Sequence, residues 1–103
     1  MNIHIVCIGN ELLAGHVTNT NLAFAGELLS DLGLPPLQEI CVPDDRQAIA
    51  RTVRRSMREA EVVLTIGGLG PTSDDVTKQA VADVLGCALQ PDADVEETIR
   101  VFL

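Results

Sequence analysis

The sequence has little aromatic character, with no tryptophan, no tyrosine and only two phenylalanines in 103 residues. Bases of single-stranded nucleic acids stack on aromatic side chains, so the chain lacks such a platform. Basic residues are also scarce, because seven Lys and Arg stand against fifteen Asp and Glu and leave a formal net charge of −8. A nucleic-acid-binding protein needs a basic patch. The composition therefore argues against nucleic acid as a partner.

Long apolar runs are missing as well, since none approaches the roughly 20 residues that cross a bilayer. The first residues do not combine a basic stretch with a long apolar one, as a secretory signal would. Only three cysteines occur, Cys7, Cys41 and Cys87, without the spacing of a C-x-x-C or zinc site. Each lies in or beside an apolar run, where a reduced thiol acts as a small core residue. We expect no membrane partner and a cytoplasmic location.

Apolar residues follow strand-like and helix-like spacing in turn. Ile3 to Ile8 is an almost unbroken apolar run, typical of a strand buried on both faces of a parallel sheet. Later apolar residues recur at helical spacing. The predicted elements are a strand at 3–8, a helix at 22–32, a strand at 37–42, a helix containing 49–57, a strand at 61–66, a helix at 76–85 and a helical pattern over 94–102.

This alternation predicts an α/β fold, a three-layer sandwich with helices on both faces of a mostly parallel, doubly wound sheet in the strand order 2-1-3. Residues 1–103 form one domain, which we expect to be partial because the chain stops among apolar residues in mid-helix. The third strand would be an exposed edge. We therefore expect further strands or a partner chain, and a homo-oligomer.

Local signals refine two of the helices. Asp44-x-x-Gln47 and Asp94-x-x-Glu97 resemble capping boxes and predict helix starts at these positions. Five of the seven basic residues fall between positions 46 and 58, which predicts a solvated outer helix face.

A glycine-rich turn follows the third predicted strand. Gly67, Gly68 and Gly70 lie within four residues, and glycines allow a backbone to approach a ligand closely. A helix that opens after such a turn presents unpaired N–H groups and the positive end of its dipole to an anion. In the 2-1-3 order this turn emerges beside the Gly9-Asn10-Glu11 turn, at the carboxyl ends of neighbouring strands. The pattern predicts a small-molecule site there.

Two acids, Asp74 and Asp75, follow the glycines and place negative charge where an anion would otherwise bind. A divalent cation shared between carboxylate and phosphate oxygens reconciles these charges. The alternative is structural, because Thr72-x-x-Asp75 has the form of a capping box. The spacing fits both interpretations.

Three segments together carry a family resemblance: residues 9–15 (GNELLAG), 18–21 (TNTN) and 65–77 (TIGGLGPTSDDVT). They resemble the amino-terminal domain of CinA, the competence/damage-inducible protein, within the wider molybdopterin-binding group of MoaB, MogA and gephyrin. The resemblance runs from residue 3 to about residue 90. It implies a three-layer α/β fold and a nucleotide-like or pterin ligand. The family's domain is longer than this chain.

The resemblance implies two functions. Proteins similar to CinA hydrolyse the pyrophosphate of ADP-ribose with a divalent metal (Mg, Mn or Co), whereas MogA-like members bind or adenylylate molybdopterin. Molybdopterin enzymes generally have Ser or Thr where this chain has Leu69, which favours the CinA branch. The alternative is a non-catalytic module, or a truncated remnant, that holds a pterin or nucleotide.

The hypothesis assigns roles to candidate residues. Asp74 and Asp75 would hold the metal, and Glu11 would position or deprotonate the attacking water or contact a ribose hydroxyl. The alternative for Glu11 is an exposed loop carboxylate, and Asn residues at the start of a helix also suit capping. The candidate ligand-binding residues are Gly67, Gly68, Gly70, Thr72, Thr77, Asn10, Asn19 and Asn21.

Overall fold

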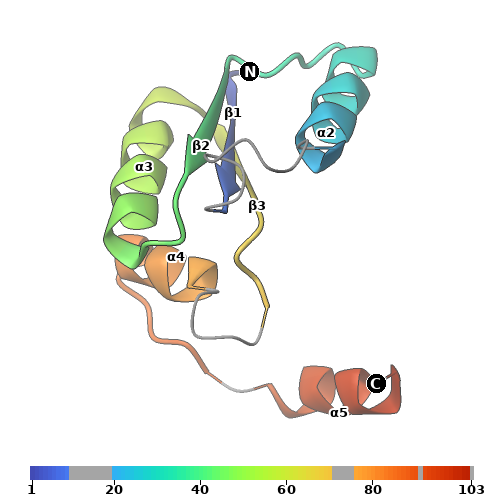
Figure 1. The fold of residues 1–103 in the computed structure, drawn as a ribbon, viewed down its shortest axis with the longest axis vertical. Helices are drawn as coiled ribbons and strands as arrows, with labels where there is room; N and C mark the ends of the chain where they lie inside the picture. Colours follow the sequence, from blue (N-terminus) through green and yellow to red (C-terminus); the bar gives the residue numbers. More distant parts are fainter. Residues whose placement is uncertain (10–19, 71–75, 91, 103) are drawn as a thin grey trace.

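The computed structural model describes residues 1–9, 20–70, 76–90 and 92–102. Its strands and helices alternate along the chain as far as α4, and a further helix follows, as the sequence predicts (Figure 1). They are β1 (Ile3–Ile8), α2 (Thr20–Asp31), β2 (Gln38–Val42), α3 (Arg46–Glu59), β3 (Val62–Ile66), α4 (Thr77–Leu85) and α5 (Ala93–Phe102).

The three strands form one parallel sheet in the order β2-β1-β3, which confirms the predicted topology. All six residues of the central strand β1 are buried. In Figure 1, α3 and α4 lie on one face of the sheet and α2 on the other, so the helices make two outer layers. α2 runs opposite to β1, which places its first turn toward the carboxyl ends of the strands.

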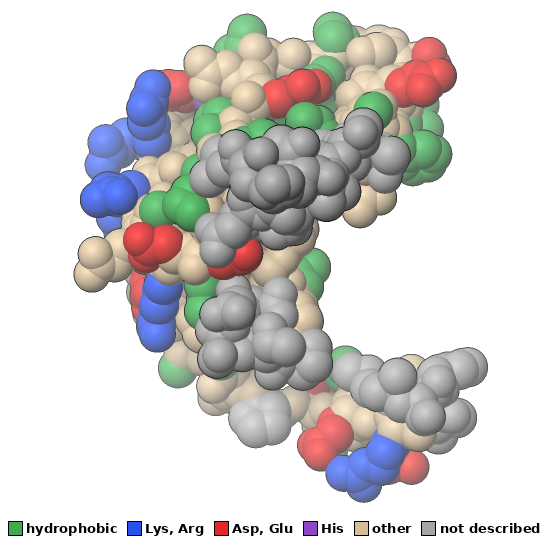
Figure 2. All heavy atoms as spheres, viewed as in Figure 1, with side chains coloured by type: hydrophobic (Ala, Val, Ile, Leu, Met, Phe, Trp, Pro, Cys, Tyr) green, Lys and Arg blue, Asp and Glu red, His purple; other side chains and the backbone are tan. Residues whose placement is uncertain are grey.

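The main core lies between the sheet and the α3/α4 layer. Val6 and Ile8 of β1 pack there with Ile49 and Val53 of α3 and with Ala80 of α4, and all five are buried. The opposite side of α3 carries the basic residues predicted to be solvated. All five arginines between positions 46 and 58 are exposed, and Figure 2 shows blue side chains gathered along this side of the molecule.

The face of the sheet that α2 covers is less well buried. Val62 and Leu64 of β3 are 41% and 39% exposed, and Phe24 of α2 is 69% exposed. α5 lies apart from the sheet in Figure 1. Among the helices the structure describes, none is long and apolar enough to span a bilayer.

Two predicted capping positions are wrong by one or two residues. Asp45, not Asp44, is the N-cap of α3, and its carboxylate accepts a hydrogen bond of 3.0 Å from the Gln47 N–H. At the start of α5 the carboxylate of Asp92, not Asp94, accepts from the N–H groups two and three residues later. Neither observed cap has Glu or Gln three residues later, so the capping-box pattern pointed to the wrong aspartate in both places. Any of these aspartates suits an N-cap, and the path of the chain into the helix decides which one caps it.

We expect Ile49→Ala to lower the free energy of unfolding by about 2–5 kcal/mol, because it leaves a cavity at a fully buried position between α3 and β1. Leu32→Ala is the control, since Leu32 is 65% exposed and its truncation is expected to cost less than about 0.5 kcal/mol. Urea unfolding followed by circular dichroism measures both. Equal losses in the two variants would contradict the assigned core.

Candidate functional site

The glycine turn after β3 is packed tightly against its neighbours. Gly67 and Gly68 have φ values of 97° and 67°, in the region that favours glycine. A Cβ on Gly67 would overlap the Ile8 carbonyl oxygen at the end of β1. A Cβ on Gly68 would overlap the Thr77 hydroxyl at the start of α4. These two positions therefore need glycine for packing within the protein itself, whatever ligand the turn meets.

Thr77 connects the glycine turn to α4. Its hydroxyl donates a hydrogen bond of 2.9 Å to the Gly67 carbonyl, and its N–H donates one of 3.1 Å to the Gly68 carbonyl. The residue is only 1% exposed. Sequence reasoning proposed a ligand contact for Thr77. The structure shows its side chain buried and bonded to the backbone of the turn, and the ligand contact stays a prediction.

The first residue of α4 is Thr77, and its N-cap is Val76, which makes no side-chain capping bond. The capping-box interpretation of Thr72-x-x-Asp75 would make Thr72 the N-cap of this helix. The N-cap is Val76, so that interpretation is wrong for α4. The Val76 side chain is apolar, so it cannot accept a hydrogen bond from the N–H groups of the first turn of α4. Such groups suit an anion at this end of α4.

The exits of β1 and β3 lie side by side, as predicted. Cys7 pairs with Ile66 in the parallel ladder, and the Ile8 carbonyl touches the position of Gly67. On the other side of β1, the Gly9 N–H donates to the Val42 carbonyl at 3.0 Å. The chain therefore leaves β1 and β3 at the same end of the sheet, where α/β folds bind ligands.

The predicted site residues divide between described and undescribed parts of the chain. Gly67, Gly68 and Gly70 form the turn after β3, and Asn21 lies exposed in the first turn of α2. Six predicted residues lie outside the described residues, and their roles stay predictions: Asn10, Glu11, Asn19, Thr72, Asp74 and Asp75. Within the described ranges no group of three or more His, Cys, Asp or Glu is placed to hold a metal ion.

A shallow groove of about 370 Å³ borders the turn on its α4 side. Leu69 of the turn and Thr77 are among its lining residues, and Lys78 supplies a positive charge. The rest of the lining is mostly apolar, from Val81 of α4 to Leu89 beyond it. A neighbouring groove of about 330 Å³ lies between α3, β3 and α4 and does not reach the turn. Only the first of these two grooves adjoins the predicted site.

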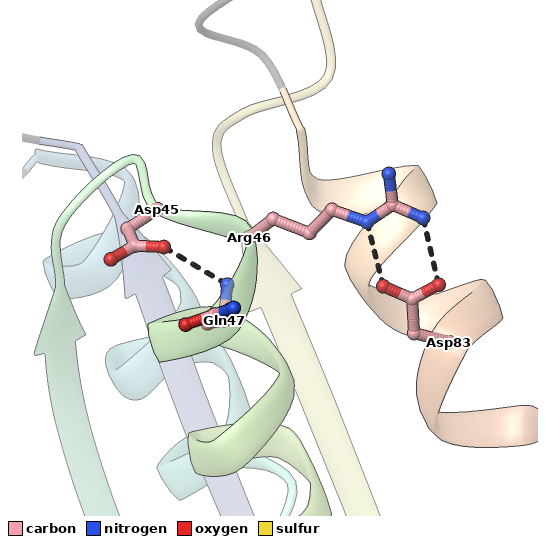
Figure 3. Close-up of polar contacts among 4 residues, drawn as sticks. All are labelled: Asp45, Arg46, Gln47 and Asp83. Carbon is pink, nitrogen blue, oxygen red and sulfur yellow. Dashed lines mark hydrogen bonds and ion pairs between the residues drawn. The ribbon is translucent and has the colours of Figure 1, made fainter.

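An ion pair joins the two helices on this face of the sheet (Figure 3). Arg46, the first residue of α3, donates hydrogen bonds of 2.6 and 2.8 Å from Nε and Nη2 to the two carboxylate oxygens of Asp83 in α4. The hydrogen bonds from Arg46 lower the pKa of Asp83, and the same contact raises the pKa of Arg46. The residues are 37 positions apart, and no sequence pattern indicated their pairing.

With this geometry in place, comparisons with known proteins identify the family. Residues 4–102 match the family described as a probable molybdopterin binding domain. The chain belongs to this family. A CinA-like protein from Salinibacter ruber is 45% identical over 102 residues, which are 99% of this chain but 25% of that protein. The resemblance to CinA is thereby confirmed.

Solved structures agree with this assignment to the molybdopterin-binding domain family. CinA from Thermoplasma acidophilum, a protein of unknown function, has a TM-score of 0.86 and 36% identity over 90% of this chain and 55% of its own. MoaB from Thermus thermophilus has a TM-score of 0.72 at 21% identity over 80% of this chain and 53% of its own, and so supports the fold alone. The chain spans about a quarter of the curated relative and about half of these structures.

We expect Gly68→Ala to destabilise the molybdopterin-binding domain more than Gly86→Ala. The two glycines have nearly the same φ, 67° and 68°, so both variants carry the left-handed cost of roughly 1–2 kcal/mol. Only Gly68→Ala also forces a methyl group against Thr77, which adds about 1–3 kcal/mol. Urea unfolding measures the difference, and equal losses would show that the turn is not held against Thr77.

The Arg46–Asp83 pair predicts a pH-dependent difference in stability. The pKa of Asp83 is lowered in the folded chain, so the pair stabilises the fold fully above the unfolded value of about 3.9. This contribution is lost as pH falls through the lower folded pKa. Asp83→Asn should therefore differ most from wild type near neutral pH and converge with it in acid, measured by urea unfolding across pH. In an Arg46→Gln background the Asp83→Asn change should have a much smaller effect, because only the weaker attraction between Asp83 and Arg54 is left to lose.

Proposed function

We propose that this domain binds a phosphate-bearing nucleotide or pterin where β1 and β3 end, and that it hydrolyses the pyrophosphate of ADP-ribose or a related nucleotide. The observation that carries the proposal is the placement of the glycine turn. Gly67 and Gly68 lie against the end of β1 on one side and against the first residue of α4 on the other. Backbone N–H groups and a helix N-terminus then meet at one edge of the sheet, the arrangement that binds phosphate.

The acids that follow the turn suit a divalent cation rather than a bare anion site. Asp74 and Asp75 supply carboxylate oxygens, the ligands that Mg²⁺ and Mn²⁺ prefer. Only five residues separate Gly70 from Val76, the N-cap of α4, and the two acids are among them. They are therefore tethered at both ends to described backbone beside the proposed phosphate position. A bound metal would supply charge stabilisation at phosphorus.

The protein's own groups would perform the remaining steps. Backbone N–H groups of the glycine turn would bind phosphate oxygens and orient the diphosphate. Glu11, two residues beyond Gly9, would hold or deprotonate the attacking water. Thr77 contributes indirectly, because its hydroxyl fixes the Gly67 carbonyl and thereby the direction of the turn. Asn19 and Asn21 would contact the ribose or base.

The second candidate function is a module that binds a pterin or nucleotide without reaction. The apolar groove beside Leu69 and Thr77 favours it, because a flat ring system fits an apolar surface better than a diphosphate does. The matching family description refers to molybdopterin binding, which also agrees with this alternative.

The test is incubation with ADP-ribose and Mg²⁺, Mn²⁺ or Co²⁺, followed by chromatography for AMP and ribose 5-phosphate. We expect both products, and Asp75→Asn should lower their rate of formation by about 100-fold or more. The matched control is Asp31→Asn, an exposed aspartate at the end of α2, which should react at the wild-type rate. Equal rates in both variants would overturn the role of Asp75.

A thermal-shift measurement separates the two candidates. A ligand at 100 times its Kd stabilises the folded chain by about 2.7 kcal/mol, a rise in Tm of more than about 10 °C for a domain of this size. A shift with ADP-ribose or a pterin but no product supports the binding module. The absence of both a shift and product would contradict the proposed function altogether.

A further inference from the structure

The sheet brings together two cysteines that are far apart in the sequence. Cys7 and Cys41 are direct register partners on the parallel strands β1 and β2. Side chains of paired residues on neighbouring strands leave the same face of a sheet. Sequence spacing alone gave no reason to relate these residues, because 33 others separate them. The third cysteine, Cys87, follows α4 and has no such partner position in the described sheet.

Strand spacing brings the pair close to the geometry of a disulfide. Neighbouring strands lie about 4.7–4.9 Å apart, and disulfide-bonded cysteines have Cα atoms about 4.4–6.8 Å apart. Their Cβ atoms must approach to about 3.5–4.5 Å, which requires a small movement of one strand. β2 is well placed to move, because it is an edge of the described sheet.

The two thiols differ in access to solvent. Cys7 is fully buried in the central strand, whereas Cys41 is exposed on the edge strand. An oxidant can therefore reach Cys41 first, and Cys7 lies next to the product of that reaction. An exposed attacking cysteine beside a second one that resolves it is the usual arrangement of redox-sensitive pairs.

We propose that Cys7 and Cys41 form a reversible thiol–disulfide pair, oxidised by a low-molecular-weight disulfide such as glutathione disulfide. The Cys41 thiolate attacks one sulfur of that disulfide, its S–S bond breaks, and one glutathione thiolate leaves. The Cys7 thiol then attacks the Cys41 sulfur, and its proton passes to the second glutathione, which leaves as a thiol. One disulfide is reduced and one is formed, so the electrons balance.

The Cys7–Cys41 disulfide would be easily reduced, and it would lie near the end of the sheet. A disulfide that requires movement of β2 stores strain, and strained disulfides are the more easily reduced ones. Two residues beyond Cys7, the Gly9 N–H bonds to the Val42 carbonyl, next to Cys41. Oxidation would therefore tie β1 to β2 covalently beside the exit of β1. The inference is independent of the proposed function.

The experiment uses the full chain, reduced and then incubated natively with glutathione disulfide, alkylated and digested with trypsin. The first basic residue is Arg46, so both cysteines lie in the fragment 1–46, whereas Cys87 lies in the fragment 79–100. We expect neither cysteine of fragment 1–46 to be alkylated. The mass of this fragment should be lower by two hydrogen atoms than the mass of its reduced, dithiol form. Cleavage after Glu11 and Glu39 should then leave two peptides joined by a bond that dithiothreitol breaks.

Variants complete the test. Cys87→Ser should form the bond as wild type does, whereas Cys41→Ser should lose it completely. Cys7→Ala, which keeps the core apolar, should stop at the glutathione adduct of Cys41. Three outcomes would each overturn the proposal. They are a stable glutathione adduct of Cys41 in the wild-type chain, a disulfide from Cys41 to Cys87 or to a second chain, and no oxidation of Cys41.

Discussion

The contact between the Gly67–Gly68 turn, the end of β1 and the first residue of α4 governs the arrangement of this protein's candidate site. The turn passes so close to the Ile8 carbonyl and the Thr77 hydroxyl that neither glycine has room for a Cβ. Two hydrogen bonds from Thr77 then hold the turn in place. Through this contact the ends of β1 and β3 and the start of α4 are held together as one unit.

This contact changes how the glycines are interpreted. The sequence suggests that they make room for a ligand, and the structure shows that two of them make room for the protein's own backbone and hydroxyl. The same turn can be packed against the protein and still bind a ligand. Tight packing fixes the direction of its backbone N–H groups, and a fixed direction favours binding. The relationship to the molybdopterin-binding domain family agrees with a ligand at this position. The reaction itself remains a proposal that depends on Glu11, Asp74 and Asp75.

Burial is unequal on the two faces of the sheet. The α3/α4 layer completes a core around Val6, Ile8 and Ile49, and the Arg46–Asp83 ion pair joins these helices at its edge. The α2 face leaves Phe24 and Leu64 substantially exposed.

Much of the fold could be predicted because it depends on local patterns. The apolar run of β1 and the helical spacing of α3 set the elements, and their alternation set the parallel sheet and the order 2-1-3. The position of the glycine turn at the end of β3 followed from the same reasoning. Capping residues were less predictable, because Asp44 and Asp45 suit the same role and only the path of the chain chooses between them.

The sequence by itself determined the elements, their order, the family and the edge of the sheet where a ligand would bind, since these follow from periodicity and contiguous motifs. Only the tertiary structure decided which residues far apart in the sequence contact one another. It turned Thr77 inward onto Gly67, paired Arg46 with Asp83, and set Cys7 beside Cys41. The physical reason is that strand register and helix packing fix these distances, and neither leaves a signal in the local spacing of residues.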